Sequence, residues 1–293
     1  MRLAIFTKNR SNPAYDAARM GADRAARLLG AETTHYVPEA FDDPVQQSAL
    51  VDQALAAKVD GIVFTPTHPT RVNEALGRIA AARVPLAGFV NRIPVAPCVS
   101  YVSSDDGKLG AAIADRLYST LGKGKVLVLA GPAESVTSID RVTAFRAAAE
   151  KHPGIQLVDT VHGDYRQDTA RARVRQWLAE HGAVDGIAAA NDVMAIGALE
   201  ALADTKLSST VVGVNAIPEA VAAIRAGRLL ASADFNAMHM CYLATECLIR
   251  HLRGEKVPAR VDLPVEIVDA ENAHLWDLPY DQRKLPTLAE TVA

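Results

Sequence analysis

Short apolar runs rich in Val, Ile and Ala alternate along this chain with amphipathic segments of about helical length. This alternation is typical of βαβ units built around parallel sheets. In the first half, the pattern predicts strands at 3–6, 33–37, 61–65, 86–90 and 99–103, and helices at 13–29, 44–57 and 71–82. Pro13 and Pro44 then fall in first helical turns, where proline is tolerated.

The same pattern starts again in the second half of the chain. Strands are predicted at 125–130, 155–161, 186–190, 211–214 and 230–233, with helices between them. A long helix at 237–253 and a strand at 261–268 follow, which is more than either half needs. We therefore expect an α/β fold of two lobes, with the chain crossing back between them and a tail from Glu271 that lies over a surface.

The composition and charge of the chain limit the classes of binding partner that we expect. Of the 293 residues, 49% are hydrophobic and 22% charged, and the net charge is -3. No block of Lys or Arg is long enough to follow a phosphate backbone or an anionic bilayer, so nucleic acid and membrane surfaces are not expected partners. The apolar runs are of strand length, far below the roughly 20 residues of a membrane span.

Cys98, Cys241 and Cys247 form neither an even set nor a CxxC spacing. Neither a disulfide framework nor a zinc site is favoured, and we expect buried thiols, no metal and no cofactor. Met1 is followed at once by a strand, which leaves no room for a leader peptide. Either a signal peptide has been removed or the protein is cytosolic.

Polar side chains occupy the loops after the predicted strands, where parallel sheets carry their ligands. The first loop, 8–12, has no GxGxxG, so a dinucleotide is not favoured. Later loops hold Asn91 and Arg92, Asn191 and Asp192, and Asn215. Amides, carboxylates and guanidinium groups suit sugar hydroxyls, which both donate and accept, while the C–H faces of a sugar pack on aromatic rings. Tyr15, Phe89, Tyr165 and Phe235 lie near strand ends.

Catalytic motifs are missing from the sequence. There is no GxSxG, HExxH or P-loop, and the glycine–lysine segment 122–125 precedes a strand instead of following one. We therefore expect no enzymatic activity. Each candidate ligand residue also has a structural alternative: Asn12, Asn191 and Asp105 suit helix caps, and the tyrosines and arginines suit ordinary core and surface positions.

Taken together, these motifs resemble the ribose-binding-like periplasmic sugar-binding proteins of ABC transporters. The resemblance covers residues 3–268 and is carried by the segments 12–15, 91–92, 104–106, 191–198, 211–215 and 218–227, together with Arg141 four residues before Phe145. It is specific to the fold and superfamily and does not specify a ligand.

The resemblance implies a type I periplasmic binding protein fold with two Rossmann-like lobes, joined by three crossovers, that close by a hinge around the ligand. The lobes would be 1–103 with 236–262, and 104–235 with 263–293. Tyr15 and Tyr165 would sandwich the ring. The ligand-binding set that it implies is Asn12, Tyr15, Asn91, Arg92, Asp106, Arg141, Tyr165, Asn191, Asn215 and Phe235. It also implies a periplasmic monomer that delivers its ligand to a membrane permease.

Three positions depart from the family pattern. The family usually has Asp where Asn91 and Asn215 stand, and often Gln where Phe235 falls. Two neutral amides beside retained arginines predict a more positive site, so a ligand with an acidic group or fewer hydroxyls, such as a sugar acid or a lactone, is a candidate alongside a neutral sugar or polyol. The alternative function is the effector-sensing core of a LacI-type transcription regulator. A sugar-modifying enzyme would need a catalytic base, for which Asp106 is the obvious candidate.

Overall fold

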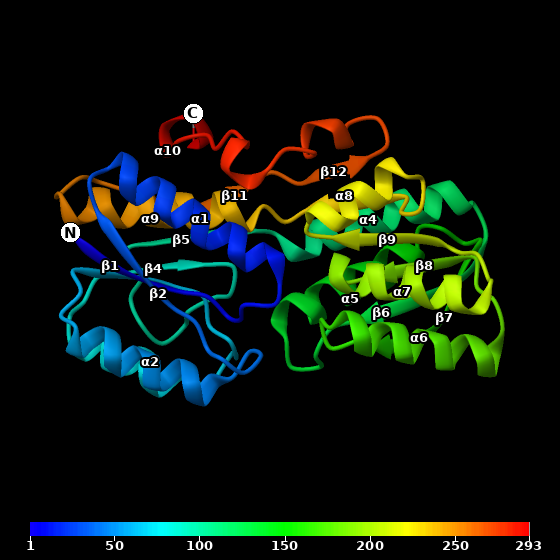
Figure 1. The fold of residues 1–293 in the computed structure, drawn as a ribbon, viewed down its shortest axis with the longest axis horizontal. Helices are drawn as coiled ribbons and strands as arrows, with labels where there is room; N and C mark the ends of the chain where they lie inside the picture. Colours follow the sequence, from blue (N-terminus) through cyan, green and yellow to red (C-terminus); the bar gives the residue numbers. More distant parts are fainter. Residues whose placement is uncertain (293) are drawn as a thin grey trace. The chain divides into compact units, whose positions relative to one another are not determined.

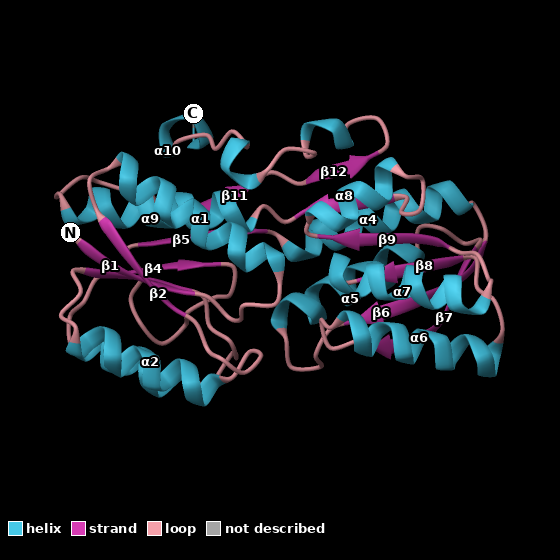
Figure 2. Cartoon of the chain, in the orientation of Figure 1, coloured by secondary structure: helices cyan, strands magenta, loops and turns pink. Residues whose placement is uncertain are grey.

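The computed structural model describes residues 1–292, and the chain divides into two compact units. Unit 1 comprises 1–104, 236–264 and the segment from Tyr280 onward, and unit 2 comprises 105–235 and 265–279. Each unit contains one six-stranded sheet with helices packed on it (Figures 1 and 2). The predicted α/β fold with two sheet-containing lobes is confirmed.

The sheet of unit 1 has the strand order β11-β5-β4-β3-β1-β2, and every neighbouring pair is parallel. Its strands are β1 (Arg2–Phe6), β2 (Glu32–Tyr36), β3 (Gly61–Phe64), β4 (Leu86–Phe89), β5 (Ser100–Ser104) and β11 (Arg260–Leu263). Its helices are α1 (Pro13–Leu28), α2 (Pro44–Ala56), α3 (Asn73–Ala81), α9 (Ala237–Leu252), α10 (Leu288–Val292) and the short 3₁₀ helix η2 (Tyr280–Gln282).

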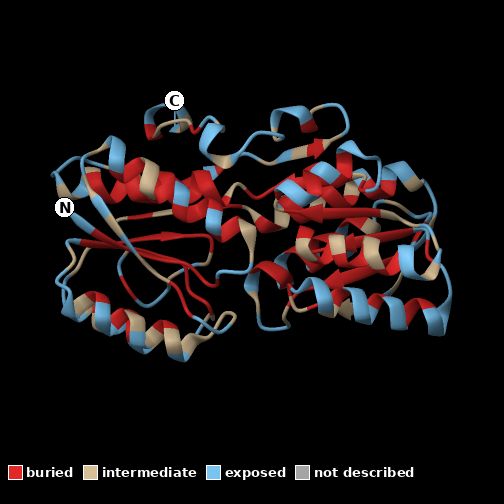
Figure 3. Ribbon diagram, in the orientation of Figure 1, coloured by how far each residue is buried: buried red, intermediate tan, exposed pale blue. Residues whose placement is uncertain are grey.

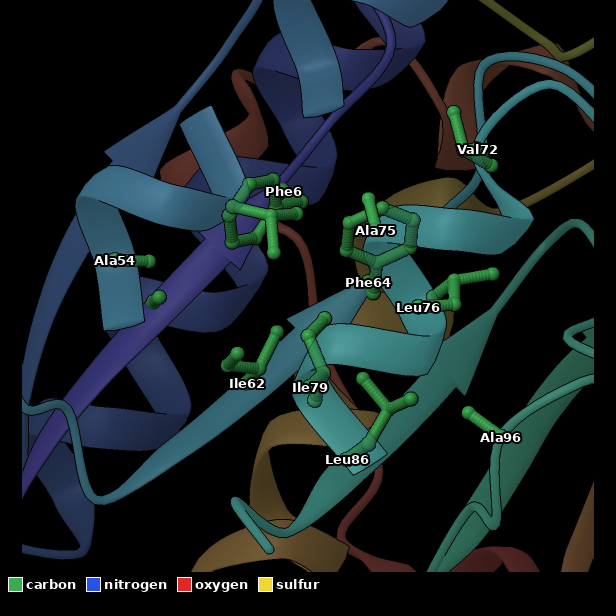
Figure 4. Packing of buried hydrophobic residues seen from close by; sticks show 12 residues of the cluster. Phe6, Ala54, Ile62, Phe64, Val72, Ala75, Leu76, Ile79, Leu86 and Ala96 are labelled. Carbon is green, nitrogen blue, oxygen red and sulfur yellow. The ribbon is translucent and has the colours of Figure 1, made fainter. Parts of the chain in front are cut away.

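Aromatic and aliphatic side chains from β1, β3, β4 and α3 form the core of unit 1 (Figure 4). The Phe6 ring stacks on Tyr36 at 5.0 Å between centroids and lies 4.9 Å from the Phe64 ring. On another part of the unit, α1 packs along α9, which is buried over nearly its whole length (Figure 3). A Cβ at Gly21 would lie 2.1 Å from the Met238 carbonyl oxygen, so this close approach requires glycine.

The sheet of unit 2 has the order β12-β10-β9-β8-β6-β7, with only the edge strand β12 antiparallel among its described pairs. Its strands are β6 (Gly124–Ala130), β7 (Ile155–His162), β8 (Gly186–Ala189), β9 (Thr210–Val214), β10 (Ala231–Asp234) and β12 (Glu266–Asp269). Its helices are α4 (Asp106–Leu121), α5 (Val136–Ala149), α6 (Gln167–His181), α7 (Asp192–Thr205), α8 (Pro218–Arg225) and the 3₁₀ helix η1 (Ala273–Leu275).

The predicted strand at 261–268 is wrong as a single element. It is two strands, β11 in unit 1 and β12 in unit 2, that separate at Pro264 and Val265. Proline has no N–H to donate to a ladder, and a strand tends to end or bend beside it. The alternation of apolar and polar residues continues through the break, so the pattern alone could not reveal it.

The end of the chain also differs from the expectation. The segment from Tyr280 onward packs on α9 of unit 1, whereas the sequence analysis placed it with the second lobe. His239 Nε2 lies 2.8 Å from the Pro286 carbonyl, the Leu288 amide donates to Glu246 at 2.9 Å, and the Leu288 side chain is buried. The chain therefore passes between the units four times, after residues 104, 235, 264 and 279, and the last passage adds to the three expected.

Two smaller expectations concern the cysteines and the membrane. Cys241 and Cys247 are buried as predicted, but Cys98 is only partly buried. Burial raises the pKa of the Cys98 thiol to about 11, which keeps it protonated at neutral pH. Within residues 1–292, every helix is too short or too polar to cross a bilayer.

Candidate functional site

Polar groups of unit 1 gather where β1, β3 and β4 end. Lys8 and Asn9 follow β1, and both contact Asp42, with Lys8 Nζ at 2.9 Å and Asn9 Nδ2 at 2.5 Å from its carboxylate oxygens. Asn9 Oδ1 in turn accepts the Asn12 amide at 2.9 Å. The Lys8 charge is thus compensated within the unit, and the loop leading into α1 is fixed by side-chain hydrogen bonds.

Two buried oxygens at this edge of unit 1 have no hydrogen-bond partner among the described residues. They are Thr65 Oγ1, directly after β3, and Asn91 Oδ1, two residues after β4. The Asn91 amide nitrogen is held by the Pro66 carbonyl at 2.8 Å. The preceding residue, Val90, has φ of 62°, which is rare for a β-branched side chain and costs about 1 to 3 kcal/mol.

The other unit 1 candidates lie in or beside the loops that follow β1 and β4. Asn12 is the N-cap of α1, and its side chain accepts the Ala14 amide at 3.0 Å. Tyr15 lies in the first turn of that helix and is buried. Arg92 follows Asn91 and is exposed. Asn12 therefore has the capping role that the sequence also allowed for it.

In unit 2, the Arg141 side chain contacts Asp106, Phe235 and the backbone of Ala190, the residue before Asn191. Its Nε and Nη2 both lie 2.7 Å from Asp106 Oδ1, and its Nη1 donates to the Ala190 carbonyl at 2.7 Å. Its guanidinium also lies 4.8 Å from the centre of the Phe235 ring, in a cation–π arrangement. Burial raises the pKa of Asp106, and the charge of Arg141 acts in the opposite direction.

Tyr165 follows β7 in a tight turn of unit 2. Both Asp164 and Tyr165 have positive φ, 54° and 58°, and the Tyr165 hydroxyl lies 3.0 Å from Thr137 Oγ1. A Cβ on Gly131, at the end of β6, would lie 2.4 Å from the Tyr165 ring. The absence of a side chain at Gly131 is what allows the ring to lie over this loop.

Asn191 and Asn215 lie in the loops that follow the neighbouring strands β8 and β9. Asn191 caps α7, with its Oδ1 accepting the Met194 amide at 2.9 Å. Asn215 has φ of 128°, and its buried Oδ1 has no partner within the described part of the chain. Each unit therefore presents at least one buried amide oxygen that can still accept a hydrogen bond.

Sequence reasoning missed several supporting residues. Side chains that hold the strand-end loops by hydrogen bonds are Asp42, Gln47, Asp192 and Ser232. Only the contact made by Asp192 has a detectable signal in the sequence. Gly213 interrupts an otherwise Val-rich strand, which indicates a close approach by another group. That group is Asp192, whose Oδ1 would lie 2.1 Å from a Cβ at Gly213.

A family model described as a periplasmic binding protein domain matches residues 3–256. The match covers most of the chain, and two α/β units with polar strand-end loops are what this class of protein presents. The chain belongs to this family, whose members are solute-binding proteins and not enzymes.

Individual relatives agree with this assignment. The ribose import binding protein RbsB of Bacillus subtilis is 26% identical over 266 residues, which is 90% of this chain and 85% of the relative. An ABC transporter solute-binding protein of Actinobacillus succinogenes with bound D-allose superposes with a TM-score of 0.88 at 24% identity, covering 93% of this chain and 99% of the other. Another from Mycobacterium smegmatis, with bound glycerol, has a TM-score of 0.85 at 28% identity and coverages of 94% and 96%.

Proposed function

We propose that this protein captures a small polyhydroxylated ligand, a sugar or polyol, for an ABC importer. The observation that carries the proposal is that two of the buried amide oxygens without a partner in the described chain, Asn91 Oδ1 in unit 1 and Asn215 Oδ1 in unit 2, lie in loops that follow sheet strands. A buried acceptor without a donor is unfavourable, and a ligand hydroxyl would satisfy it. Ribose, D-allose and glycerol, the ligands named for three of the relatives, all carry such hydroxyls.

Each unit would supply its own part of the contacts. In unit 1 these are Asn12, Tyr15, Asn91 and Arg92, and in unit 2 Asp106, Arg141, Tyr165, Asn191, Asn215 and Phe235. The amide oxygens would accept from ligand hydroxyls, the guanidinium groups would donate, and the aromatic rings would pack on C–H faces.

Charge favours a neutral ligand over a sugar acid. The two amides that replace the usual acids would leave a positive site only if no other acid compensated the charges of the arginines. Arg141 instead shares two hydrogen bonds with the Asp106 carboxylate, and Asp192 lies nearby. A ligand carboxylate would therefore compete with an acid already bound to Arg141, and we rank a sugar acid below a neutral sugar or polyol.

A thermal-shift screen followed by calorimetry tests the proposal. The panel is D-ribose, D-allose, xylitol, glycerol and the acid D-ribonate. A ligand at 100 times its dissociation constant stabilises the folded state by about 2.7 kcal/mol, which is readily detected. Hits confined to neutral sugars or polyols support the proposal, tighter binding of ribonate than ribose would reverse the charge argument, and no shift with any sugar or polyol would refute the ligand class.

Two variants locate the site in calorimetry with the best neutral hit. We expect Asn91→Ala and Arg141→Lys each to weaken binding at least about tenfold, because each removes directional hydrogen bonding. Arg146→Lys is the matched control, since Arg146 is exposed on the same helix as Arg141. Unchanged affinity in both test variants would place the site elsewhere.

The same proposal extends to location and partners. We infer that the native protein is exported to the periplasm with a cleaved signal peptide, acts as a monomer, and delivers its ligand to a membrane permease. Cell fractionation with N-terminal sequencing of the native protein tests the export, and light scattering tests the monomer. Ligand-dependent stimulation of the reconstituted transporter's ATPase tests delivery.

A further inference from the structure

Asp192 is a buried carboxylate in unit 2 that contacts the loop after β9. It occupies the first position of α7, directly after the Asn191 cap, and its exposed fraction is 0%. Ser232 Oγ, on β10, lies 2.8 and 2.9 Å from its two oxygens, and the Ile217 amide donates to Oδ2 at 3.1 Å. The side chain thus accepts hydrogen bonds from two other segments of the unit.

Ser232 extends this contact to the next residue of the loop. Its Oγ accepts the Ala216 amide at 3.0 Å, so its own hydroxyl proton is free to be donated to Asp192. The amides of Ala216 and Ile217, which directly follow Asn215, are therefore both held by the Asp192–Ser232 pair. The pair fixes the backbone immediately beyond a candidate ligand residue.

The backbone of this loop needs such support. Asn215 and Ala216 have φ of 128° and 50°, two consecutive non-glycine residues in a region that L residues rarely adopt. Strained conformations of this kind persist only where the surroundings hold them. Gly213 completes the arrangement, because any side chain there would collide with Asp192.

We propose that Asp192, acting with Ser232, is a positioning residue that holds Asn215 in its strained conformation and aims its side-chain oxygen at the ligand. This inference rests on the proposed ligand-binding function. Asp192 does not itself contact the ligand in this scheme. It acts through the two backbone amides and through the serine hydroxyl.

The protonation of Asp192 can be followed through the pH dependence of ligand binding. The pKa of Asp192 is raised to about 7 in all: burial raises it most, the hydrogen bonds from Ser232 and Ile217 and the charge of Arg141 lower it, and the charge of Asp234 raises it. The ionised form accepts the loop hydrogen bonds best. Ligand binding should therefore weaken as pH falls from 8 to 6, because protonation turns one of the acceptors into a donor.

Hydrogen–deuterium exchange in the ligand-free protein tests the positioning step by itself. In Asp192→Asn and in Ser232→Ala, we expect the amides of Ala216 and Ile217 to exchange at least tenfold faster than in the wild type. Asp204→Asn is the control, since Asp204 lies in the last turn of the same helix and pairs with Arg171 at the surface. Unchanged exchange in both test variants would overturn the proposal whether or not a ligand is known.

Calorimetry with D-ribose and D-allose at pH 6, 7 and 8 tests the effect on binding. We expect Asp192→Asn to bind about tenfold more weakly at pH 8 and to lose the pH dependence, and Asp204→Asn to behave as the wild type. Faster exchange with unchanged affinity would overturn the role in binding. If the wild type bound neither sugar, the proposed function would be in question, while the exchange experiment would still decide whether Asp192 holds the loop.

Discussion

Arg141 contacts a carboxylate, a backbone carbonyl and an aromatic face at once, and it is almost fully buried. A buried ion pair gives little net stability compared with an apolar pair, but removing one partner leaves an uncompensated charge. These contacts therefore make the folding of unit 2 depend on Arg141.

We expect Arg141→Met to lower the free energy of unfolding by about 3 kcal/mol, because Asp106 would remain buried without its partner. Arg146→Met, an exposed position on the same helix, should change it by less than about 0.5 kcal/mol. Urea unfolding followed by circular dichroism measures both. A cost below about 1 kcal/mol for Arg141→Met would show that Asp106 is readily neutralised or hydrated.

For single residues, the sequence indicates which side chains are candidates for the site better than it indicates which groups those side chains contact. Arg141 and Asp106 were both identified as candidates, but nothing along the chain indicates that they bind each other or that the Ala190 carbonyl completes the contact. Asn12 and Asn191 were recognised as possible caps because capping is local in sequence. The Asp192–Ser232 contact spans 40 residues, and Gly213 is its only trace in the pattern.

Most strands and helices could be predicted, because the spacing of apolar residues reflects whether one face or both faces of an element are buried. The prediction of elements failed where the chain passes from one sheet to the other while the alternation of apolar and polar residues continues. Residues 260–267 alternate as one strand would, yet the chain divides at Pro264 into β11 and β12, which belong to different sheets and pair in opposite senses. Pairing partners are a property of the folded chain that local periodicity does not contain.

The turn after β6 gives a prediction at this scale. We expect Gly131→Ala to displace the Tyr165 ring and to weaken ligand binding at least about tenfold, because its Cβ would lie 2.4 Å from that ring. Gly77→Ala is the matched control. Gly77 lies within α3 with no atom near the added Cβ, so alanine there should stabilise the protein by about 0.5 to 1 kcal/mol.

Calorimetry and thermal unfolding of both glycine variants distinguish the two effects. Wild-type affinity in Gly131→Ala would mean that Tyr165 adjusts without consequence for the ligand. A loss of stability in Gly77→Ala would show that the helix is constrained by more than its intrinsic propensity.

For the whole molecule, the segment from Tyr280 onward ties the end of the chain to unit 1. Leu285 and Leu288 are buried there, and Glu246 and His239 of α9 bond to its backbone. We expect the double variant Leu285→Ala and Leu288→Ala to lower the free energy of unfolding by about 4 kcal/mol or more, since each buried leucine contributes about 2 kcal/mol or more. The control replaces the exposed Gln282 and Lys284 by alanine and should have little effect.

Differential scanning calorimetry of the two double variants makes this comparison. A cost below about 1 kcal/mol for the leucine pair would mean that the segment contributes little to unit 1. A comparable cost in the control would mean that its polar side chains matter as much as its apolar ones.

The four passages of the chain between the units also set an order of assembly during synthesis. Unit 1 cannot be completed from its first 104 residues, because α9, β11 and the final segment come from beyond residue 235. The α1 surface that packs on α9 stays uncovered until more than 80% of the protein has left the ribosome. A nascent chain of half length already holds the core cluster around Phe6 and Phe64, but it lacks α9 of unit 1 and β7 to β10 of unit 2. Neither unit can therefore be completed until synthesis is nearly finished, and the incomplete units stay open to chaperones until then.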